Sequence, residues 1–185
     1  IKTRTSGDQN VYLMSLEEKA PAVLLTAHEG NIAHVLFGFS PDSKSLNFGT
    51  DEFGEYVEAW RYDLGTGKRE NIAARDWDVM AYGESSNGKY SVLAVNEDAS
   101  TGIYTYRDGQ EKPFDLKGNM ARGELQGIRF SPDGRYVAVF IDSDISPTDV
   151  YLIDLRRRAI RQLTHGLNAT IHPVDLVEGE VIRYK

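Results

Sequence analysis

One short motif recurs in this chain and limits the folds that it can adopt. The tetrapeptide Phe-Ser-Pro-Asp occupies residues 39–42 and returns at 130–133, which is 91 residues later. A degenerate copy lies about halfway, because the turn at 88–90 is 45 residues after 43–45 and 46 before 134–136. A period of about 40 to 45 residues with turn signals in phase is typical of the blades of a β-propeller.

Each copy of the motif is followed by three short runs with little helical periodicity, separated by turn residues. Together with the run that ends in the motif, they predict four short strands per repeat and an all-β chain. The runs are 45–48, 57–63 and 69–73 in the first copy, 90–95, 103–106 and 112–116 in the second, and 136–141, 150–154 and 159–164 in the third.

Two features of the repeat predict its core and its turns. The run 136–141 has too few polar residues for a half-solvated strand, so we expect it to be covered on both faces. Ser-Pro-Asp-Gly at 131–134 suits a type I turn, and Asn-Gly at 87–88 serves as a hairpin-type pair in the middle copy. The residues expected in the core are Phe39, Phe130, Tyr151 and Leu163.

The phase of the repeat divides the chain into units. Residues 31–76, 77–121 and 122–167 each make a complete blade, and 1–30 supply the last two strands of another, at 10–16 and 22–26. Propellers typically have four to eight blades. The prediction is therefore a β-propeller segment of about three and a half four-stranded blades, followed by a linker at 168–185.

Composition excludes several classes of function. The 185 residues carry a formal net charge of −7 and no cysteine, and the one basic run is Arg156-Arg157-Arg158. An acidic chain argues against nucleic-acid binding, and no apolar window is long enough to span a membrane. Zero cysteines exclude disulfides, thiol catalysis and zinc-thiolate sites. They favour a reducing compartment, so we expect a cytoplasmic protein.

The stretch after the third repeat carries a resemblance to a known family. Leu-Thr-His-Gly-Leu-Asn at 163–168 and the segment 172–185 resemble the exit from the propeller of prolyl oligopeptidase family serine peptidases, especially the acylaminoacyl-peptidase-like branch. Gly179 stands where that linker has proline. The Ser-Pro-Asp-Gly repeats resemble the blades of the same family and also those of TolB-type propellers.

The resemblance implies a division of labour with a second domain. In the family, the propeller covers the active site of an α/β-hydrolase domain and restricts substrates to short peptides. This chain is then the non-catalytic, substrate-gating portion of a serine peptidase, and its partners are the hydrolase domain and short peptides. The alternative is a TolB-type propeller that acts as a protein-interaction scaffold.

No catalytic triad can be assembled from the sequence. Ser85 lies in Gly-Glu-Ser-Ser-Asn-Gly at 83–88, which lacks the second glycine of a nucleophile elbow and leads into a β run rather than a helix. His165 lies in a closing turn and His172 precedes a proline, and neither has a predicted serine partner. No catalytic residue and no cofactor site are predicted.

Metal and glycan sites are not predicted either. Residues 142–146 alternate oxygen donors as a calcium loop does, but the sixth position is Pro147 and the twelfth is Ile153, where glycine and glutamate are required. His28 and His34 are six residues apart with no carboxylate in ligand spacing. The sequon at Asn168 is read as chance.

Acidic loops recur between the second and third strands of each repeat. Equivalent loops of a repeat lie on one face, so they predict an acidic rim, either a solubilising surface or a docking surface for cationic termini or a partner domain. Trp60 and Trp77 are expected to pack between blades. The acidic residues are Asp51, Glu52 and Glu55, then Glu97 and Asp98, then Asp142 and Asp144.

Incomplete closure of a propeller leaves strand edges and apolar faces uncovered. We therefore expect uncovered residues at both ends of the chain and possible self-association there. In another arrangement, a strand at 181–184 completes the broken blade. The residues expected to be uncovered are Val11, Leu13 and Leu16 at one end and Val150, Leu152 and Leu155 at the other.

Overall fold

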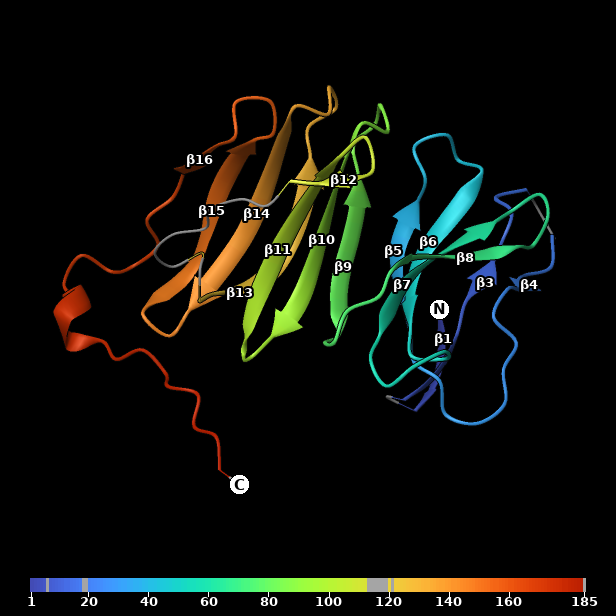
Figure 1. The fold of residues 1–185 in the computed structure, drawn as a ribbon, viewed down its shortest axis with the longest axis horizontal. Coiled ribbons are helices and arrows are strands. Elements are labelled where there is room, and N and C mark those ends of the chain that lie inside the picture. Colours follow the sequence, from blue (N-terminus) through green and yellow to red (C-terminus); the bar gives the residue numbers. More distant parts are fainter. Residues whose placement is uncertain (6, 18–19, 113–119, 121, 185) are drawn as a thin grey trace. The chain divides into compact units, whose positions relative to one another are not determined.

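The structure is a computed structural model that describes residues 1–5, 7–17, 20–112, 120 and 122–184. The regular elements of these residues are β-strands and a short 3-10 helix, Pro173–Asp175. The strands form three four-stranded and two two-stranded antiparallel sheets (Figure 1). The chain divides into two compact units, Ile1–Tyr82 and Gly83–Lys185. No helix among the described residues is long and apolar enough to cross a membrane.

The first unit contains two hairpins and one complete sheet. The small core beneath the hairpins joins Val11 and Leu25 to Leu46 of the sheet. The first hairpin was not foreseen from the sequence. The strands are β1 (Lys2–Thr5) with β2 (Asp8–Asn10), β3 (Tyr12–Leu13) with β4 (Val23–Leu24), and the sheet β5 (His34–Phe39), β6 (Ser45–Thr50), β7 (Glu58–Asp63) and β8 (Arg69–Ala73).

The other two four-stranded sheets also keep their strands in chain order. They are β9 (Val79–Glu84), β10 (Tyr90–Glu97), β11 (Ser100–Arg107) and β12 (Gln110–Glu111), then β13 (Glu124–Phe130), β14 (Tyr136–Ser143), β15 (Ser146–Asp154) and β16 (Ala159–Gln162). Of the run expected at 112–116, residues 113–116 lie outside the described residues. Residues 181–184 form no strand, so the strand expected there is absent. The blade boundaries stay a prediction, although each sheet falls inside one expected range.

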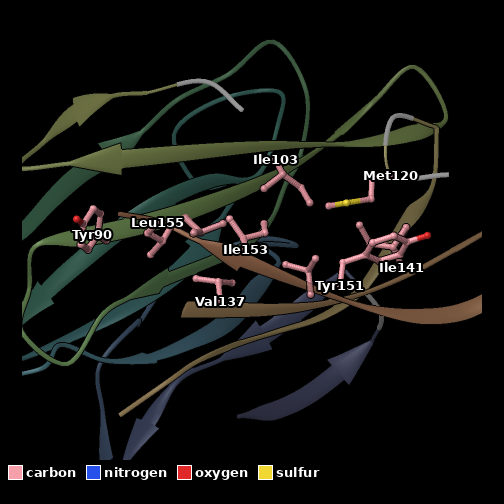
Figure 2. Packing of buried hydrophobic residues seen from close by; sticks show 10 residues of the cluster. Tyr90, Ile103, Met120, Val137, Ile141, Tyr151, Ile153 and Leu155 are labelled. Carbon is pink, nitrogen blue, oxygen red and sulfur yellow. The ribbon is translucent and has the colours of Figure 1, made fainter. Parts of the chain in front are cut away.

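The second strand of each four-stranded sheet has few or no exposed residues. All six residues of β6 are buried, and residues 136–141 of β14 alternate between buried and half-buried with none exposed. In the run 136–141, one face is therefore buried and the other half-buried, so the cover on both faces that the sequence predicts is found only in part. Figure 2 shows the largest core, in which side chains of β10 and β11 meet those of β14 and β15. Its buried members are Tyr90, Val92, Ile103, Met120, Val137, Val139, Ile141, Tyr151, Ile153 and Leu155.

One serine hydroxyl closes the turn between the first and second strands of each sheet. In the third sheet, Ser131 Oγ donates to Asp133 Oδ1 (2.6 Å) and accepts from the Tyr136 N–H (2.9 Å). The Gly134 N–H donates to the Ser131 carbonyl at 2.9 Å, which is the hydrogen bond of a β-turn. Ser40, Asp42 and Ser45 make the same contacts in the first sheet.

The middle copy preserves this network even though its sequence has diverged. Ser85 Oγ donates to Asn87 Oδ1 (2.8 Å) and accepts from the Tyr90 N–H (2.9 Å). Ser85 is therefore the counterpart of Ser40 and Ser131. Asn87 replaces an aspartate whose pKa, in the other two copies, is lowered by hydrogen bonds from the serine hydroxyl and a backbone N–H.

Two of the four residues expected in the core are exposed. Tyr151 is buried and Phe130 is half-buried against the core, but Phe39 is 56% exposed and Leu163 is 44% exposed. The Phe130 ring fits against Gly83 of β9, where a Cβ atom would lie 3.2 Å from it. Phe39 ends β5, and the sheet that precedes β5 in the chain contains only β3 and β4. Among the described residues, this sheet has no strand that corresponds to β9, the strand that Phe130 contacts. Leu163 follows β16, which is the edge strand of its sheet.

The residues expected to be uncovered at the chain ends also need correction. Val11 is fully buried and Leu155 is 6% exposed, because each belongs to a core cluster. Leu16 is fully exposed, as expected, whereas Leu13, Val150 and Leu152 are half-buried. Five further exposed apolar side chains of the first unit lie on β4 and β5, at Val23, Leu24, Val35, Leu36 and Phe39.

We predict that Ser85→Ala destabilises the chain by about 1–3 kcal/mol, since the buried Tyr90 N–H loses its acceptor, Ser85 Oγ, and the turn loses its brace. Equilibrium urea unfolding measures the change. The matched control is Ser86→Ala in the same turn, an exposed residue whose hydroxyl donates to the Pro132 carbonyl. Its expected cost is below about 1 kcal/mol. Equal costs for the two variants would contradict the role given to Ser85.

Candidate functional site

An acidic cleft of about 780 Å³ lies at one end of the sheets of the second unit. Its walls are the β10–β11 loop, the residues that lead into β13, the β14–β15 loop and the C-terminal segment. Five carboxylates and one arginine line it: Asp98, Glu124, Asp144, Glu178, Glu180 and Arg122. This concentration of negative charge makes the cleft the strongest candidate for binding a cationic group.

Three contacts fix the C-terminal segment along this cleft. Arg122 pairs with Glu178 at 2.7 Å, the Gly179 N–H donates to Asp144 Oδ2 at 2.7 Å, and Arg183 pairs with Asp98. Each contact is exposed and is worth little alone. Their common effect is to hold residues 178–183 against the loops at this end of the unit.

The backbone at Gly179 explains why glycine stands in place of proline. Its N–H is a donor to Asp144, and proline has none. A Cβ atom at this position would lie 2.7 Å from Asp144 Oδ2, so any larger residue would displace that carboxylate. Gly179 therefore permits the close approach of the segment to the β14–β15 loop.

The acidic rim expected from the repeat is present in only part of the chain. Asp98 and Asp144, from the second and third copies, line the same cleft. In the first copy, Asp51 Oδ1 accepts from the Ala33 N–H at 2.8 Å and Glu52 pairs with Arg69 at 2.7 Å. These two carboxylates brace the first unit instead of forming a rim.

The residues considered for catalysis are not brought into a triad by these contacts. Ser85 is fully buried, and its hydroxyl serves the turn described above. His165 and His172 are exposed in the segment after β16. Gly166, next to His165, donates its N–H to the buried Asp149 at 2.9 Å, which gives this closing turn a structural role.

Asp149 is a buried acid that the sequence did not single out. It is 2% exposed and accepts hydrogen bonds from Ser146, Gln162, Thr164 and Gly166. Burial raises its pKa, but these four bonds outweigh burial and leave the pKa lowered. Asp149 therefore stays charged and ties the segment after β16 to β15.

Neither tryptophan is buried between sheets as expected. Trp60 is half-buried on β7, donates Nε1–H to Glu58 Oε2 at 3.0 Å and packs on Phe53 with ring centroids 4.2 Å apart. Trp77 is 42% exposed in the loop before β9. Both therefore lie at the surface of the first unit.

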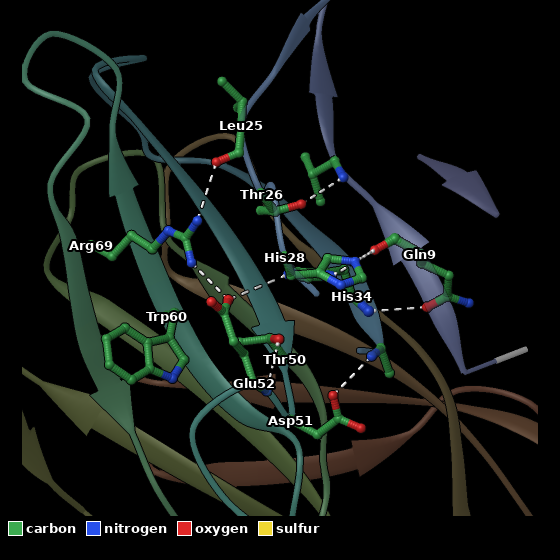
Figure 3. Close-up of polar contacts among 12 residues, drawn as sticks. Gln9, Leu25, Thr26, His28, His34, Thr50, Asp51, Glu52, Trp60 and Arg69 are labelled. Carbon is green, nitrogen blue, oxygen red and sulfur yellow. Dashed lines mark hydrogen bonds and ion pairs between the residues drawn. The ribbon is translucent and has the colours of Figure 1, made fainter. Parts of the chain in front are cut away.

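A buried histidine pair in the first unit is the main polar feature that spacing alone missed. His28 Nε2 and His34 Nδ1 lie 3.1 and 2.8 Å from the same acceptor, the Gln9 carbonyl (Figure 3). Contrary to the sequence reading, the fold places carboxylates beside them. Asp8 Oδ1 is 3.8 Å from His28, and Glu52 Oε2 is 3.9 Å from His34.

The shared carbonyl sets the tautomer of each ring. A carbonyl only accepts, so His28 carries its proton on Nε2 and His34 on Nδ1. The other two ring nitrogens, His28 Nδ1 and His34 Nε2, are buried without a hydrogen-bond partner. Within the described part of the chain, no three His, Asp or Glu residues converge as metal ligands.

His34 is held in its neutral form. Burial lowers its pKa, and His28 and Arg69 act in the same direction. The Gln9 carbonyl and Glu52 raise the pKa but do not outweigh burial. The remaining charged groups around the pair are Asp8 on β2 and Arg4 on β1, which lie 3.4 Å apart.

We predict that acid weakens the first unit through His34. The unfolded chain takes up a proton near pH 6.5, whereas the folded chain stays neutral to lower pH, so stability falls as the pH drops below 6.5. Urea unfolding from about pH 8 to about pH 5 measures the slope, and His34→Gln should flatten it. His165→Gln is the control, because His165 is exposed. An unchanged slope in His34→Gln would refute this account.

Comparison with known proteins identifies the fold of the chain but does not assign it to a family. No family model and no curated protein matches the chain. TolB from Acinetobacter baumannii is 23% identical with a TM-score of 0.63, over 84% of this chain and 38% of that one. A prolyl endopeptidase structure is 14% identical with a TM-score of 0.71, over 92% and 24%. Dipeptidyl peptidase 4 from Porphyromonas gingivalis is 16% identical with a TM-score of 0.63, over 86% and 23%.

These matches agree with the sheet topology. Four-stranded antiparallel sheets with their strands in chain order are the blades of a propeller. The chain spans less than two fifths of the TolB structure and about a quarter of the prolyl endopeptidase. It is a β-propeller segment of the type found in TolB and in prolyl peptidases.

Proposed function

We propose that the chain is the non-catalytic propeller portion of a prolyl oligopeptidase family serine peptidase and controls the access of short peptides. The observation that carries the proposal is the C-terminal segment. Residues 172–185 resemble the family's exit linker, and 178–183 are held across the acidic end of the second unit.

The position of this segment gives the acidic cleft a role. A domain that follows Lys185 begins near the cleft, because Arg183, only two residues earlier, is paired with Asp98. A peptide that moves between the propeller and that domain then passes five carboxylates. Their field attracts the amino terminus and basic side chains of a peptide and repels acidic ones.

In this proposal the chain gates and does not hydrolyse. Hydrolysis needs a serine activated by a base and held on a strained turn. The hydroxyl of Ser85 is engaged in a propeller turn, so the nucleophile comes from the hydrolase domain.

A second candidate is a TolB-type scaffold for protein interaction. It is favoured by the higher sequence identity to TolB, 23% against 14% for the prolyl endopeptidase. The reading frame after Lys185 discriminates the two. A reading frame that continues into a hydrolase domain with a nucleophile elbow supports the first candidate. A reading frame that encodes no such domain supports the second.

We predict that, in the full-length protein, Glu124→Gln with Glu180→Gln raises the KM for peptides with a free amino terminus by about threefold to tenfold, because the cleft loses two charges. The KM for the same peptides acetylated at the amino terminus should stay unchanged. Initial rates on chromogenic peptides measure both values.

The matched control is Glu70→Gln, an exposed carboxylate on β8. It should alter neither KM. Equal effects on free and acetylated peptides would contradict the electrostatic role of the cleft. Turnover by residues 1–185 alone that is abolished by Ser85→Ala would contradict the gating proposal itself.

A further inference from the structure

A small basic cavity of about 100 Å³ lies at the end of the second unit opposite to the acidic cleft. It adjoins Tyr90, the first residue of β10, whereas the cleft lies beyond the last residue, Glu97. The eight residues of β10 separate the two sites by roughly 23 Å, at about 3.3 Å per residue.

Four cationic side chains from two sheets line this cavity. Arg107 ends β11, Lys112 follows β12, and Arg156 and Arg158 lie in the turn between β15 and β16. The sequence offered only the run 156–158, which is too short to form a patch. Packing of the two sheets adds Arg107 and Lys112, which lie more than 40 residues earlier in the chain.

No carboxylate is among the described residues that line the cavity. Asp108 lies 3.5 Å from Arg107, but both side chains are more than half exposed, so the pair is weak. The carboxylate of Asp154 accepts from the backbone N–H groups of Arg156 and Arg157 and pairs with Arg135 at 2.9 Å. Asp154 therefore stabilises this turn and is already paired with Arg135.

The backbone at Arg158 points to a role for its side chain. Arg158 has φ 55°, in the left-handed region that glycine adopts most easily. Gly67, 91 residues earlier and therefore at the equivalent turn of the first copy, has φ 72°. The third copy thus carries an arginine at a position where the backbone favours glycine.

We propose that this cavity binds a single phosphate group, either inorganic phosphate or a phosphomonoester. Guanidinium groups form paired, charge-assisted hydrogen bonds with phosphate oxygens, and lysine adds a compact charge. The cavity has room for one such group, while the wall formed by Tyr90 and Leu155 is largely apolar. The net charge of −7 repels extended polyanions, so a single group fits better than a nucleic acid.

The test is a titration of the isotopically labelled 185-residue chain with sodium phosphate at constant ionic strength, followed by amide NMR. We expect saturable shifts for residues 105–107 and 155–158 below ~10 mM phosphate. Arg156→Gln should weaken binding about tenfold or more. Arg157→Gln is the matched control, because it removes the same charge from the same turn and Arg157 does not line the cavity.

The variant Arg158→Gly distinguishes an effect on phosphate binding from an effect on folding. It should weaken phosphate binding about tenfold while stability to urea stays equal or rises, since glycine suits the left-handed backbone. A parallel titration with phosphoserine shows whether the ligand is inorganic phosphate or a phosphomonoester. Tighter binding of phosphoserine assigns the site to phosphomonoesters, and equal or weaker binding assigns it to inorganic phosphate.

Three results would overturn the proposal. The first is the absence of saturable shifts in the folded chain. The second is equal weakening by Arg156→Gln and Arg157→Gln, which would reduce the effect to general electrostatics. The third is acetate that binds as tightly as phosphate, which would make the cavity a carboxylate site.

Discussion

The second strand of each four-stranded sheet is paired along both edges and has few or no exposed side chains, and this constraint decides where function can lie. A strand such as β6 has no surface to offer a ligand, because its backbone is paired on both sides and all of its side chains are buried. Recognition is therefore confined to the strand ends. The repeated serine, which closes the turn before β6, β10 and β14, sets where those ends begin.

The two ends of the second unit have opposite charge. The β10–β11 and β14–β15 loops gather carboxylates, while the ends of β11 and β15 gather arginines. The net charge of −7 alone does not reveal that acidic and basic side chains gather at opposite ends of the unit. The acidic end also holds the C-terminal segment. In the function that we propose, the hydrolase domain joins the chain at that end.

The turn residues made the repeat recognisable in the sequence. Proline, aspartate and glycine in the turns, together with the 91-residue period, predicted most strand positions. The core was harder to predict. Phe39 and Phe130 occupy equivalent positions, yet only Phe130 faces a strand, β9, with a glycine that admits its ring.

The sites were the least predictable part, because each is made by tertiary packing. The histidine pair meets Asp8 and Glu52 only when β2 packs against β5. The basic cavity needs Arg107 and Arg156 from different sheets. Neither association has a fixed spacing along the chain. The acidic cleft was partly foreseen, because equivalent loops of a repeat share one face.

The separation of two oppositely charged ends is the central claim, and one experiment tests it directly. The same labelled chain is titrated first with a short peptide amide that has a free amino terminus, then with phosphate, and the amide shifts are mapped for each. The account predicts that the peptide moves signals at 98–100, 124 and 143–144 and that phosphate moves 105–107 and 155–158. Overlapping sets of shifted residues would contradict it.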